Sequence, residues 1–264
     1  MKLGKLRKAG EYQMNTMAKI ENWYTEESFE AINPFDPKRV SIVIPALNEE
    51  VSIERVIRGV SKYTAQILVV DGHSNDMTVA IARRLGVEVI WDKKKGKGDA
   101  IRTAINHLKG DVVVFIDADG SHDPSSIPAM VQPILDGRYD HITGSRLLGG
   151  SSELHGGFDE CLRLMGSAFI TACINKRFNV RLSDSQNGFR AIRTSVLREL
   201  RLRENKTTIE QEMIMETLHQ GFKMGEIPTH EYKRIGGVSK IKLSRVWLGY
   251  GICLARKLLP KRMS

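Results

Sequence analysis

From Val40 onward the chain alternates short apolar runs with amphipathic stretches, and this alternation restricts its fold more than any other feature. The apolar runs are "VSIVIP", "QILVVD", "VEVIW" and "DVVVFID". Stretches of helical periodicity lie between them, such as "EEVSIERVIRGVSKY" and "GKGDAIRTAINHLKG". Short β-branched runs that alternate with helices indicate βαβ units. The expected fold class is therefore α/β, with a mostly parallel sheet covered by helices on both faces.

The flanking segments differ from this central pattern. Residues 1–38 are polar and of mixed charge, and we expect them to form an N-terminal extension. Residues 39–242 are expected to form one large domain, which adds helices at "SSIPAMVQPILDG" and "TTIEQEMIMETLHQG" and strands at "YDHITGS" and "KMGEIP". Residues 243–264 mix aromatic, aliphatic and basic residues. They predict an amphipathic basic helix that lies on a membrane surface or packs on the domain.

Polar residues follow each of the first four apolar runs. Asn48 and Glu49 follow the first, Asp71 ends the second, and Asp117 and Asp119 end the fourth. The basic loop "KKKGKG" follows the third. In open α/β sheets, ligands bind at the carboxyl ends of the strands, so these groups are expected to form one site with acidic and basic parts.

The sharpest chemical signal is the pair Asp117 and Asp119 within "VVVFIDADGSHDP". Two carboxylates crowded at the end of a buried strand repel each other unless a cation lies between them. Carboxylates two positions apart on an extended segment point the same way. Mg²⁺ and Mn²⁺ take such oxygen ligands and bridge them to phosphates. We therefore expect a divalent metal site, and the alternative is a solvated acidic turn that caps the next helix.

Two basic, glycine-containing loops suggest an anionic ligand. "DKKKGKGDA" could bind a diphosphate through lysine charge, open backbone N–H groups and a helix N-terminus, or it could be a solvated loop. It lacks the spacing of a P-loop. "KRIGGVSK" suits a mobile loop that closes on phosphate, or an exposed hinge.

The composition restricts the classes of binding partner and the cellular compartment that we expect. The formal net charge of +9 suggests an anionic partner, but the chain shows no nucleic-acid motif and few aromatic residues for base stacking. The three cysteines have no paired spacing, so a reducing compartment is expected. No secretory signal and no apolar stretch of about 20 residues occurs, so we expect a cytoplasmic protein without a membrane span.

Taken in order, the motifs between Val40 and Lys242 resemble those of the family 2 glycosyltransferases. Within that family they are most similar to the polyprenyl-phosphate sugar transferases of the dolichyl-phosphate mannose synthase type. The motifs are "IVIPALNEE", "VVDGHSNDMT", "GKGDAIRTAI", "DADGSHDP", "GSR", "DSQNGFRA" and "RIGGVSK". The chain departs from the family pattern at Gly72, Ser121 and Asn187. The resemblance implies a GT-A, Rossmann-like sheet flanked by helices, with a single catalytic domain at residues 39–242.

The resemblance also implies roles for individual residues. The residues expected to bind the nucleotide sugar are Pro45, Leu47, Asn48, Glu49, Asp71, Lys97, Asp117, Ala118 and Asp119. The expected metal ligands are Asp117, Asp119 and Ser121, with Mg²⁺ or Mn²⁺ as the ion. The residues expected to bind the acceptor are Arg146, Asp184, Asn187 and Arg190. The residues expected to act in catalysis are Asp119, Arg146, Arg190, Arg234 and Lys240.

The implied reaction is metal-dependent transfer of a hexose with inversion, from a GDP- or UDP-sugar to a polyprenyl or dolichyl phosphate. Mannose and glucose are the expected sugars, and the expected location is the cytoplasmic face of a membrane, bound peripherally. A lipid phosphate is already anionic and needs no general base. The first alternative is transfer to a hydroxyl of a growing glycan, with Glu210 or Glu212 as base. The others are a nucleotidyltransferase and a nucleotide-binding module without turnover.

Overall fold

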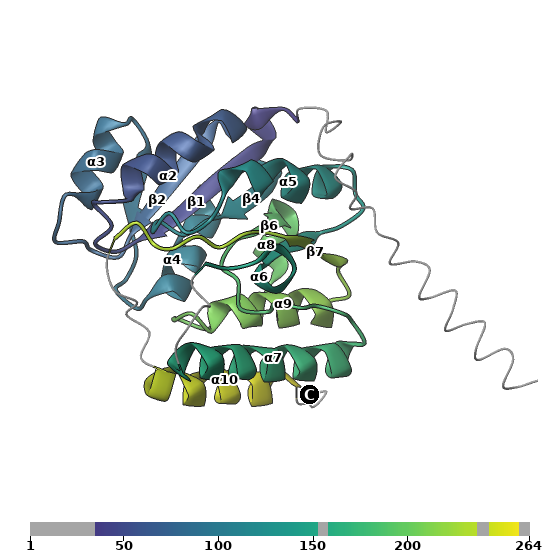
Figure 1. Ribbon diagram of the computed structural model, residues 1–264. Coiled ribbons are helices and arrows are strands. Elements are labelled where there is room, and N and C mark those ends of the chain that lie inside the picture. Colours follow the sequence, from purple (N-terminus) through teal and green to yellow (C-terminus); the bar gives the residue numbers. More distant parts are fainter. Residues whose placement is uncertain (1–34, 153–157, 237–242, 259–264) are drawn as a thin grey trace, which may run out of the picture. The chain divides into compact units, whose positions relative to one another are not determined.

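A seven-stranded sheet organises the part of the chain that the computed structural model describes, which is residues 35–152, 158–236 and 243–258 (Figure 1). The strand order is β3-β2-β1-β4-β6-β5-β7. All neighbouring strands are parallel except that β6 runs antiparallel to both β4 and β5. The strands are β1 (Val40–Ala46), β2 (Gln66–Asp71), β3 (Glu88–Trp91), β4 (Val112–Phe115), β5 (His141–Ser145), β6 (Arg190–Arg193) and β7 (Met224–Pro228). The predicted mostly parallel sheet is confirmed.

Helices cover both faces of this sheet. The α-helices are α2 (Ile53–Val60), α3 (Thr78–Arg84), α4 (Lys97–Ala104), α5 (Ile127–Leu135), α6 (Arg146–Gly149), α7 (Phe158–Phe178), α8 (Thr194–Glu199), α9 (Ile209–His219) and α10 (Leu243–Leu258). Short 3₁₀ turns lie at Pro37–Arg39, Ser61–Tyr63, Ile105–His107 and Pro124–Ser126. In Figure 1, α2 and α5 lie on one side of the sheet and α4 and α9 on the other.

The parallel strands bring the predicted site residues to one edge. In the β1–β2 register Ala46 is opposite Asp71, and in the β1–β4 register Val43 is opposite Phe115. Strands β1 and β4 contain no exposed residue, which explains their almost continuous apolar sequences. Because the strands are parallel and in register, the turn after β1, the end of β2 and the aspartates after β4 meet at the same edge.

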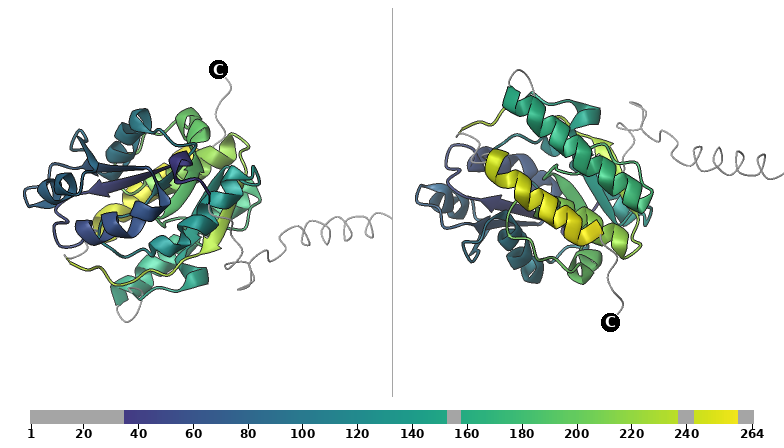
Figure 2. Two further views of the ribbon diagram at one scale, coloured as in Figure 1. Left: turned by 90° about the horizontal axis from the view of Figure 1, so that it is seen from above. Right: turned by 90° about the horizontal axis from the view of Figure 1, so that it is seen from below.

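A third layer lies beyond α9, where α7 and α10 lie next to each other (Figure 2). An apolar cluster joins the three helices, with Ile174 from α7, Ile214 from α9 and Leu254 from α10 as fully or almost fully buried members. The predicted C-terminal helix is therefore present as α10, and one face of it packs on the domain. Residues 259–264 of that prediction lie outside the described residues.

A buried ionic triad fixes α10 on α9. The Nζ atom of Lys257 lies 2.8 Å from a carboxylate oxygen of Glu212 and 2.7 Å from one of Glu216. Burial alone would lower the pKa of Lys257, but the two carboxylates outweigh burial and raise it. The second oxygen of Glu212 accepts hydrogen bonds from the backbone N–H groups of Arg203 and Glu204, both at 2.8 Å. A charge triad of this kind is stable only while it is complete, because removal of one partner leaves a buried charge unpaired.

His141 in β5 gives the folded protein a predictable dependence on pH. Its side chain is fully buried, and its Nδ1 atom lies 2.9 Å from the hydroxyl of Thr217. Burial, with the nearby charge of Arg190, holds the pKa of His141 well below its ordinary value, so the folded protein keeps this imidazole neutral. Below about pH 6.5 the unfolded chain takes up a proton that the folded chain does not, and stability falls by about 1.4 kcal/mol per pH unit from this group.

We expect His141→Gln to flatten the decrease of unfolding free energy between about pH 7 and about pH 5. Urea unfolding of the variant and the wild type across this range measures the two slopes. Asn106→Gln, an exposed substitution that removes no titratable group, is the control and should keep the wild-type slope. Equal slopes for His141→Gln and wild type would show that another group carries the effect.

Candidate active site

The two aspartates that follow β4 each have a separate cationic partner. An oxygen of Asp117 lies 2.5 Å from Nζ of Lys97, and its other oxygen lies 3.5 Å from Nε2 of His122. Asp119 is 4% exposed, and one of its oxygens lies 3.3 Å from a guanidinium nitrogen of Arg234. The carboxylates are thus held at the sheet edge by cations that come from other elements.

Lys97, the first residue of α4, also reaches Glu210 in the first turn of α9, at 2.7 Å. Burial alone would lower the pKa of Lys97, but Asp117 and Glu210 outweigh burial and raise it. Burial would raise the pKa of Asp117, but Lys97 and His122 outweigh burial and hold it far below its usual range. Lys97 and Asp117 therefore both stay charged, and Glu210 is the second carboxylate in contact with Lys97.

The glycines of "GKGDA" have a packing role that the sequence did not reveal. The N–H of Gly98 donates to the carbonyl of Asn205 at 2.9 Å, and the N–H of Asp99 shares this acceptor at 3.4 Å. A Cβ atom on Gly98 would collide with the backbone carbonyl of Glu204. The expectation that these N–H groups are open for a diphosphate is therefore wrong for Gly98 and Asp99. The side chain of Lys97 reaches Asp117 from this loop.

Two residues of this cluster were not identified from the sequence. His122 is 7% exposed, stacks on Phe189 with ring centroids 5.1 Å apart, and has no hydrogen-bond partner at Nδ1. Gly188 lies so close that a Cβ atom there would be 2.5 Å from Nζ of Lys97 and 2.7 Å from an oxygen of Asp117. The position of His122 within "DADGSH" was the available signal, and no sequence signal linked Gly188 to Lys97.

Ser121 and Ala118 lie inside the aspartate turn. The hydroxyl of Ser121 donates to Asp119 at 2.7 Å, and its backbone N–H donates to the same oxygen at 3.0 Å. Ala118 is 3% exposed. In this arrangement Ser121 orients Asp119, and its role as a metal ligand stays a prediction.

The segment that follows β7 runs beside the aspartate turn. The N–H of Tyr232 donates to the carbonyl of Ser121 at 2.8 Å, and the N–H of Ile235 donates to that of Asp119 at 3.1 Å. These contacts place Arg234 beside Asp119. The first residues of the predicted loop "KRIGGVSK" therefore contact the aspartate turn, whereas its last residue, Lys240, lies outside the described residues.

The residues predicted to contact the nucleotide at this edge lie at the ends of β1 and β2 and in the turns that follow these strands, and hydrogen bonds join the two turns. The carboxylate of Asp71 is fully buried and accepts hydrogen bonds from the hydroxyl and the N–H of Ser74, at 2.6 and 2.8 Å. The N–H of Asn48 donates to the same hydroxyl at 2.8 Å, and the N–H of Glu49 donates to Thr78 at 2.8 Å. Pro45 lies in β1, and Leu47 is 41% exposed just beyond it.

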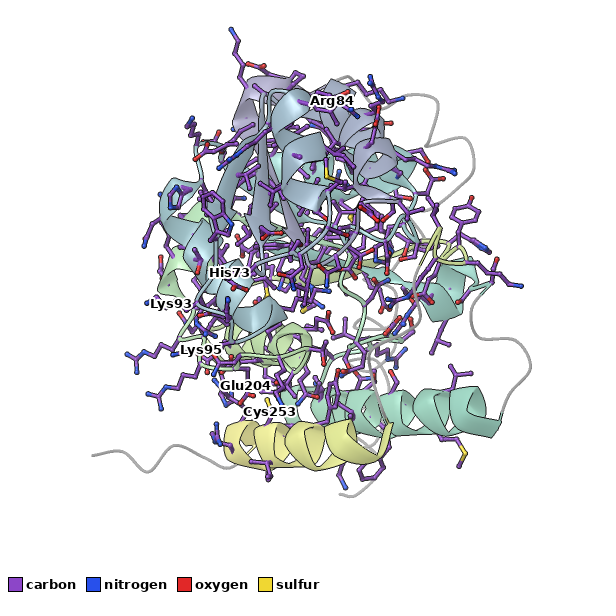
Figure 3. All side chains as sticks on the ribbon, turned by 90° about the vertical axis from the view of Figure 1, so that its left-hand side faces the viewer. His73, Arg84, Lys93, Lys95, Glu204 and Cys253 are labelled. Atoms are coloured by element: carbon purple, nitrogen blue, oxygen red, sulfur yellow. The ribbon has the colours of Figure 1, made fainter. Side chains whose placement is uncertain are left out.

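Basic residues continue along the same side of the molecule. Figure 3 labels His73, Lys93 and Lys95, which follow one another from the end of β2 toward Glu204 and Cys253. His73 contacts the carbonyl of Asp92 at 2.9 Å, so the turn after β2 and the turn after β3 are joined. The exposed lysines of this loop therefore lie beside the predicted nucleotide turn rather than next to the aspartates.

Arg146 and Asp184 form the best-defined ion pair of the predicted acceptor region. The Nε and Nη2 atoms of Arg146 lie 2.6 and 3.0 Å from the two oxygens of Asp184, and Nη1 lies 3.4 Å from an oxygen of Glu231. Glu226 in β7 holds this turn, because its carboxylate accepts from the N–H of Asp184 and the N–H and hydroxyl of Ser183. Arg146 is therefore fixed along one edge of its guanidinium.

Asn187 and Arg190 are internal. Asn187 is 1% exposed and contacts Thr229 and the N–H of Phe189. Arg190 is also 1% exposed, and its guanidinium donates to the backbone carbonyls of Asn187 and Glu210. Burial lowers the pKa of Arg190, and Glu210 and Asp184 partly oppose this effect. These contacts position Glu210, and the predicted contact of both residues with an acceptor stays a prediction.

The donor set fits a hard divalent ion. Asp117 and Asp119 present carboxylate oxygens two residues apart, which is the chemistry that Mg²⁺ and Mn²⁺ prefer. Within the described ranges, no three His, Cys, Asp or Glu side chains gather as a complete metal cluster. The aspartates would hold such an ion together with oxygens of a bound diphosphate, as is usual for Mg²⁺.

Comparison with known proteins identifies the family. The model of glycosyl transferase family 2 matches residues 41–201. The glycosyltransferase AglJ of Haloferax volcanii is 30% identical over 206 residues, which cover 76% of this chain and 65% of that protein. The chain therefore spans slightly less than two thirds of this relative.

Two further relatives are matched over most of their length. A dolichyl-phosphate hexose transferase of Haloferax volcanii is 28% identical, covering 85% of this chain and 96% of that protein. A UDP-N-acetylglucosamine–dolichyl-phosphate N-acetylglucosaminyltransferase of Methanococcus voltae is 27% identical, covering 72% and 84%.

Among solved structures, glucosyl-3-phosphoglycerate synthase of Mycobacterium tuberculosis, in complex with Mn²⁺, UDP-glucose and phosphoglyceric acid, matches with a TM-score of 0.67. The two proteins are 21% identical over 91% of this chain and 86% of that one, so this likeness concerns the fold.

We expect Gly188→Ala to inactivate the protein and to lower its melting temperature by about a few degrees, because it separates a buried ion pair. The new methyl group would push apart Lys97 and Asp117, whose flexible ends can move without disturbing the core. Nucleotide release from a nucleotide sugar and thermal unfolding are the two measurements. Gly251→Ala, where nothing lies within 4 Å of the added atom, is the control and should keep activity. Full activity of Gly188→Ala would show that the Lys97–Asp117 contact is dispensable.

Proposed function

Because this chain belongs to the family 2 glycosyltransferases, we propose that it transfers a hexose from a nucleotide diphosphate sugar to a polyprenyl phosphate. The observation that supports binding of the nucleotide sugar is the separate pairing of Asp117 with Lys97 and of Asp119 with Arg234. This arrangement balances carboxylates and cations at one sheet edge. A diphosphate that brings its own divalent ion can replace these ion pairs without leaving a buried charge uncompensated.

The chain's residues have distinct parts in the proposed reaction. A bound Mg²⁺ or Mn²⁺ would supply Lewis-acid stabilisation of the diphosphate, with Asp117 and Asp119 as its ligands. Lys97 and Arg234, once released from the aspartates, add positive charge where the leaving diphosphate forms. Asp71 and the turn at Asn48 and Glu49 hold the nucleotide. Direct displacement at the anomeric carbon then inverts its configuration.

A phosphate acceptor agrees with the acid–base groups of the site. A polyprenyl phosphate is anionic near neutral pH and attacks without a general base. Glu210 is ion-paired to Lys97 at 2.7 Å and serves as a charge partner in this reaction. Two relatives are named dolichyl-phosphate sugar transferases, which supports the lipid phosphate class.

Transfer to a hydroxyl is the second candidate, and one observation favours it. The guanidinium of Arg146 already contacts two carboxylates, Asp184 and Glu231, which reduces its attraction for a phosphate. A hydroxyl acceptor would need a base, and the structure separates the two candidates. Glu212 is ion-paired with Lys257 in the buried triad, whereas Glu210 faces Lys97 and Asp117. Glu210 is therefore the base in this alternative.

A surface formed by α7 and α10 supports a peripheral membrane location. Met165 and Phe169 on α7 are each 63% exposed, and Ile252 on α10 is 48% exposed. The right-hand view of Figure 2 shows the two helices side by side on one face. Exposed cations lie in their last turns, at Lys176, Arg177 and Arg256. The α10 sequence contains no acidic residue, so this α7–α10 surface suits anionic lipid.

No helix among the described residues is long and apolar enough to cross a bilayer. Attachment through the α7–α10 surface would bring the protein to a lipid-linked acceptor without a spanning segment. Tyr250 of α10 connects this surface to the site, because its hydroxyl donates to Thr207 at 2.9 Å, three residues before Glu210. The membrane-facing helix and the charge cluster are therefore neighbours in the fold.

We expect label from a GDP- or UDP-hexose to appear in the organic phase when the protein is incubated with Mg²⁺ or Mn²⁺ and a polyprenyl phosphate. The physical reason is that the transferred sugar becomes part of an amphiphile. Asp119→Asn should remove this product, because the neutral amide is a poor ligand for a divalent ion. A label that stays aqueous with polyprenyl phosphate, but enters a glycan with a free hydroxyl, would favour the second candidate.

We expect the double variant Phe169→Ser/Ile252→Ser to bind anionic vesicles at least about tenfold more weakly than the wild type, because it removes two exposed apolar side chains. Vesicle co-sedimentation at low and high salt is the measurement, and wild-type binding should weaken with salt. Met77→Ser, at an apolar side chain 58% exposed outside the α7–α10 surface, is the control. If the double variant binds vesicles normally but changes oligomeric state, the surface is an interface between two copies.

A further inference from the structure

The guanidinium of Arg146 makes two unequal contacts. Along one edge it forms a bidentate pair with Asp184, with nitrogen–oxygen distances of 2.6 and 3.0 Å. Its remaining nitrogen, Nη1, lies 3.4 Å from Glu231, a longer and weaker contact. The side chain of Asp184 is 2% exposed, whereas that of Glu231 is 16% exposed. The Nη1 edge is therefore the exchangeable side of this arginine.

Neighbouring groups also hold the carboxylate of Asp184 more firmly than that of Glu231. Asp184 is fixed by the N–H of Gln186 at 3.0 Å and by Glu226, which accepts from the N–H of Asp184 itself at 2.8 Å. Among the residues that the structure describes, the carboxylate of Glu231 has one further partner, the hydroxyl of Ser151 at 2.7 Å. Both carboxylates thus have a neutral donor, but Asp184 holds Arg146 with two short contacts and Glu231 with one long contact. Glu231 can therefore leave Arg146 at lower free-energy cost.

The backbone keeps Glu231 in place even when its side chain moves. Its carbonyl accepts from the N–H of Ser152 at 2.7 Å, and its N–H donates to Gly150 at 3.1 Å. It also bridges to His122, next to the aspartate turn. Glu231 is thus held between the aspartate turn and Arg146.

We propose that Glu231 is a specificity-determining residue that competes with the phosphate of the acceptor for the Nη1 edge of Arg146. This inference deepens the proposed function and rests on it. Asp184 and Glu226 hold the arginine in place, while the carboxylate of Glu231 occupies the position that an incoming phosphate takes. An anion bound there displaces the carboxylate of Glu231, which stays close enough to repel the anion. The site thereby favours an acceptor that binds through several contacts over a small free phosphate ion.

The test is Glu231→Gln in the full chain, because glutamine keeps an oxygen for Ser151 but removes the charge. With saturating donor, the KM for a polyprenyl phosphate should fall about three- to tenfold, since removal of a like charge a few ångströms away strengthens anion binding. The kcat and the KM for the donor should stay within about twofold. The control is Glu54→Gln, which removes a carboxylate of α2 that pairs with Arg58 of α2 and Arg84 of α3. This variant should change neither kcat nor the two KM values.

Two results would overturn the proposal. An unchanged or higher KM for the polyprenyl phosphate would show that Glu231 does not compete with the acceptor. A loss of kcat of about a hundredfold or more with unchanged KM would make Glu231 an acid–base group instead. A salt titration gives a second readout, because the KM of the wild type and of the variant should converge as ionic strength rises.

Failure of the proposed function would be recognised separately. If the wild type forms no lipid-linked product, the binding of a short-chain polyprenyl phosphate to wild type and Glu231→Gln is compared by calorimetry without donor. Tighter binding of this lipid phosphate by the variant would support the competition between Glu231 and phosphate for Arg146. Equal or weaker binding would reject it. Inorganic phosphate in the same experiment should also bind the variant more tightly, because the same like charge is removed, but it should still bind more weakly than the polyprenyl phosphate. Equal affinity for the two ligands would contradict selection for a multiply bound acceptor.

Discussion

The contact of Lys97 with both Asp117 and Glu210 is the interaction on which the rest of the site depends. It joins the end of β4, the start of α4 and the first turn of α9, at distances of 2.5 and 2.7 Å. A buried cation between two carboxylates is stable only when all three are present and charged. The same arrangement fixes Asp117, one of the two aspartates proposed to hold a divalent ion, so one electrostatic requirement serves the fold and the proposed chemistry.

Helix α9 transmits this constraint to the outer layer. Its first turn gives Glu210 to the site, and Glu212 and Glu216 bind Lys257 of α10 on its other side. Charged residues on opposite sides of one short helix thus tie the charge cluster to the α7–α10 surface. If that surface binds lipid as proposed, α10 lies at the membrane and α9 connects it to the charge cluster at Lys97.

The family and the sheet could be predicted from the sequence, and both predictions are confirmed. The apolar run at Val112–Phe115 became a fully buried strand, and the family model covers residues 41–201. The choice between Glu210 and Glu212 could not be made, because residues two apart on a helix point in different directions and their partners come from distant segments. Likewise, nothing near Arg190 in the sequence indicated that it would be 1% exposed.

The sequence by itself determined the strands, the helices and the aspartates after β4, because apolar periodicity and residue type act over a few neighbouring positions. Tertiary structure alone decided which charges meet. Lys97 and Glu210 are 113 positions apart, and Arg146 and Glu231 are 85 positions apart. The strength of an ion pair depends on distance and burial in the folded chain, and neither can be read from spacing along the sequence. The partner of each arginine and lysine in the site was therefore fixed only when the sheet brought these segments together.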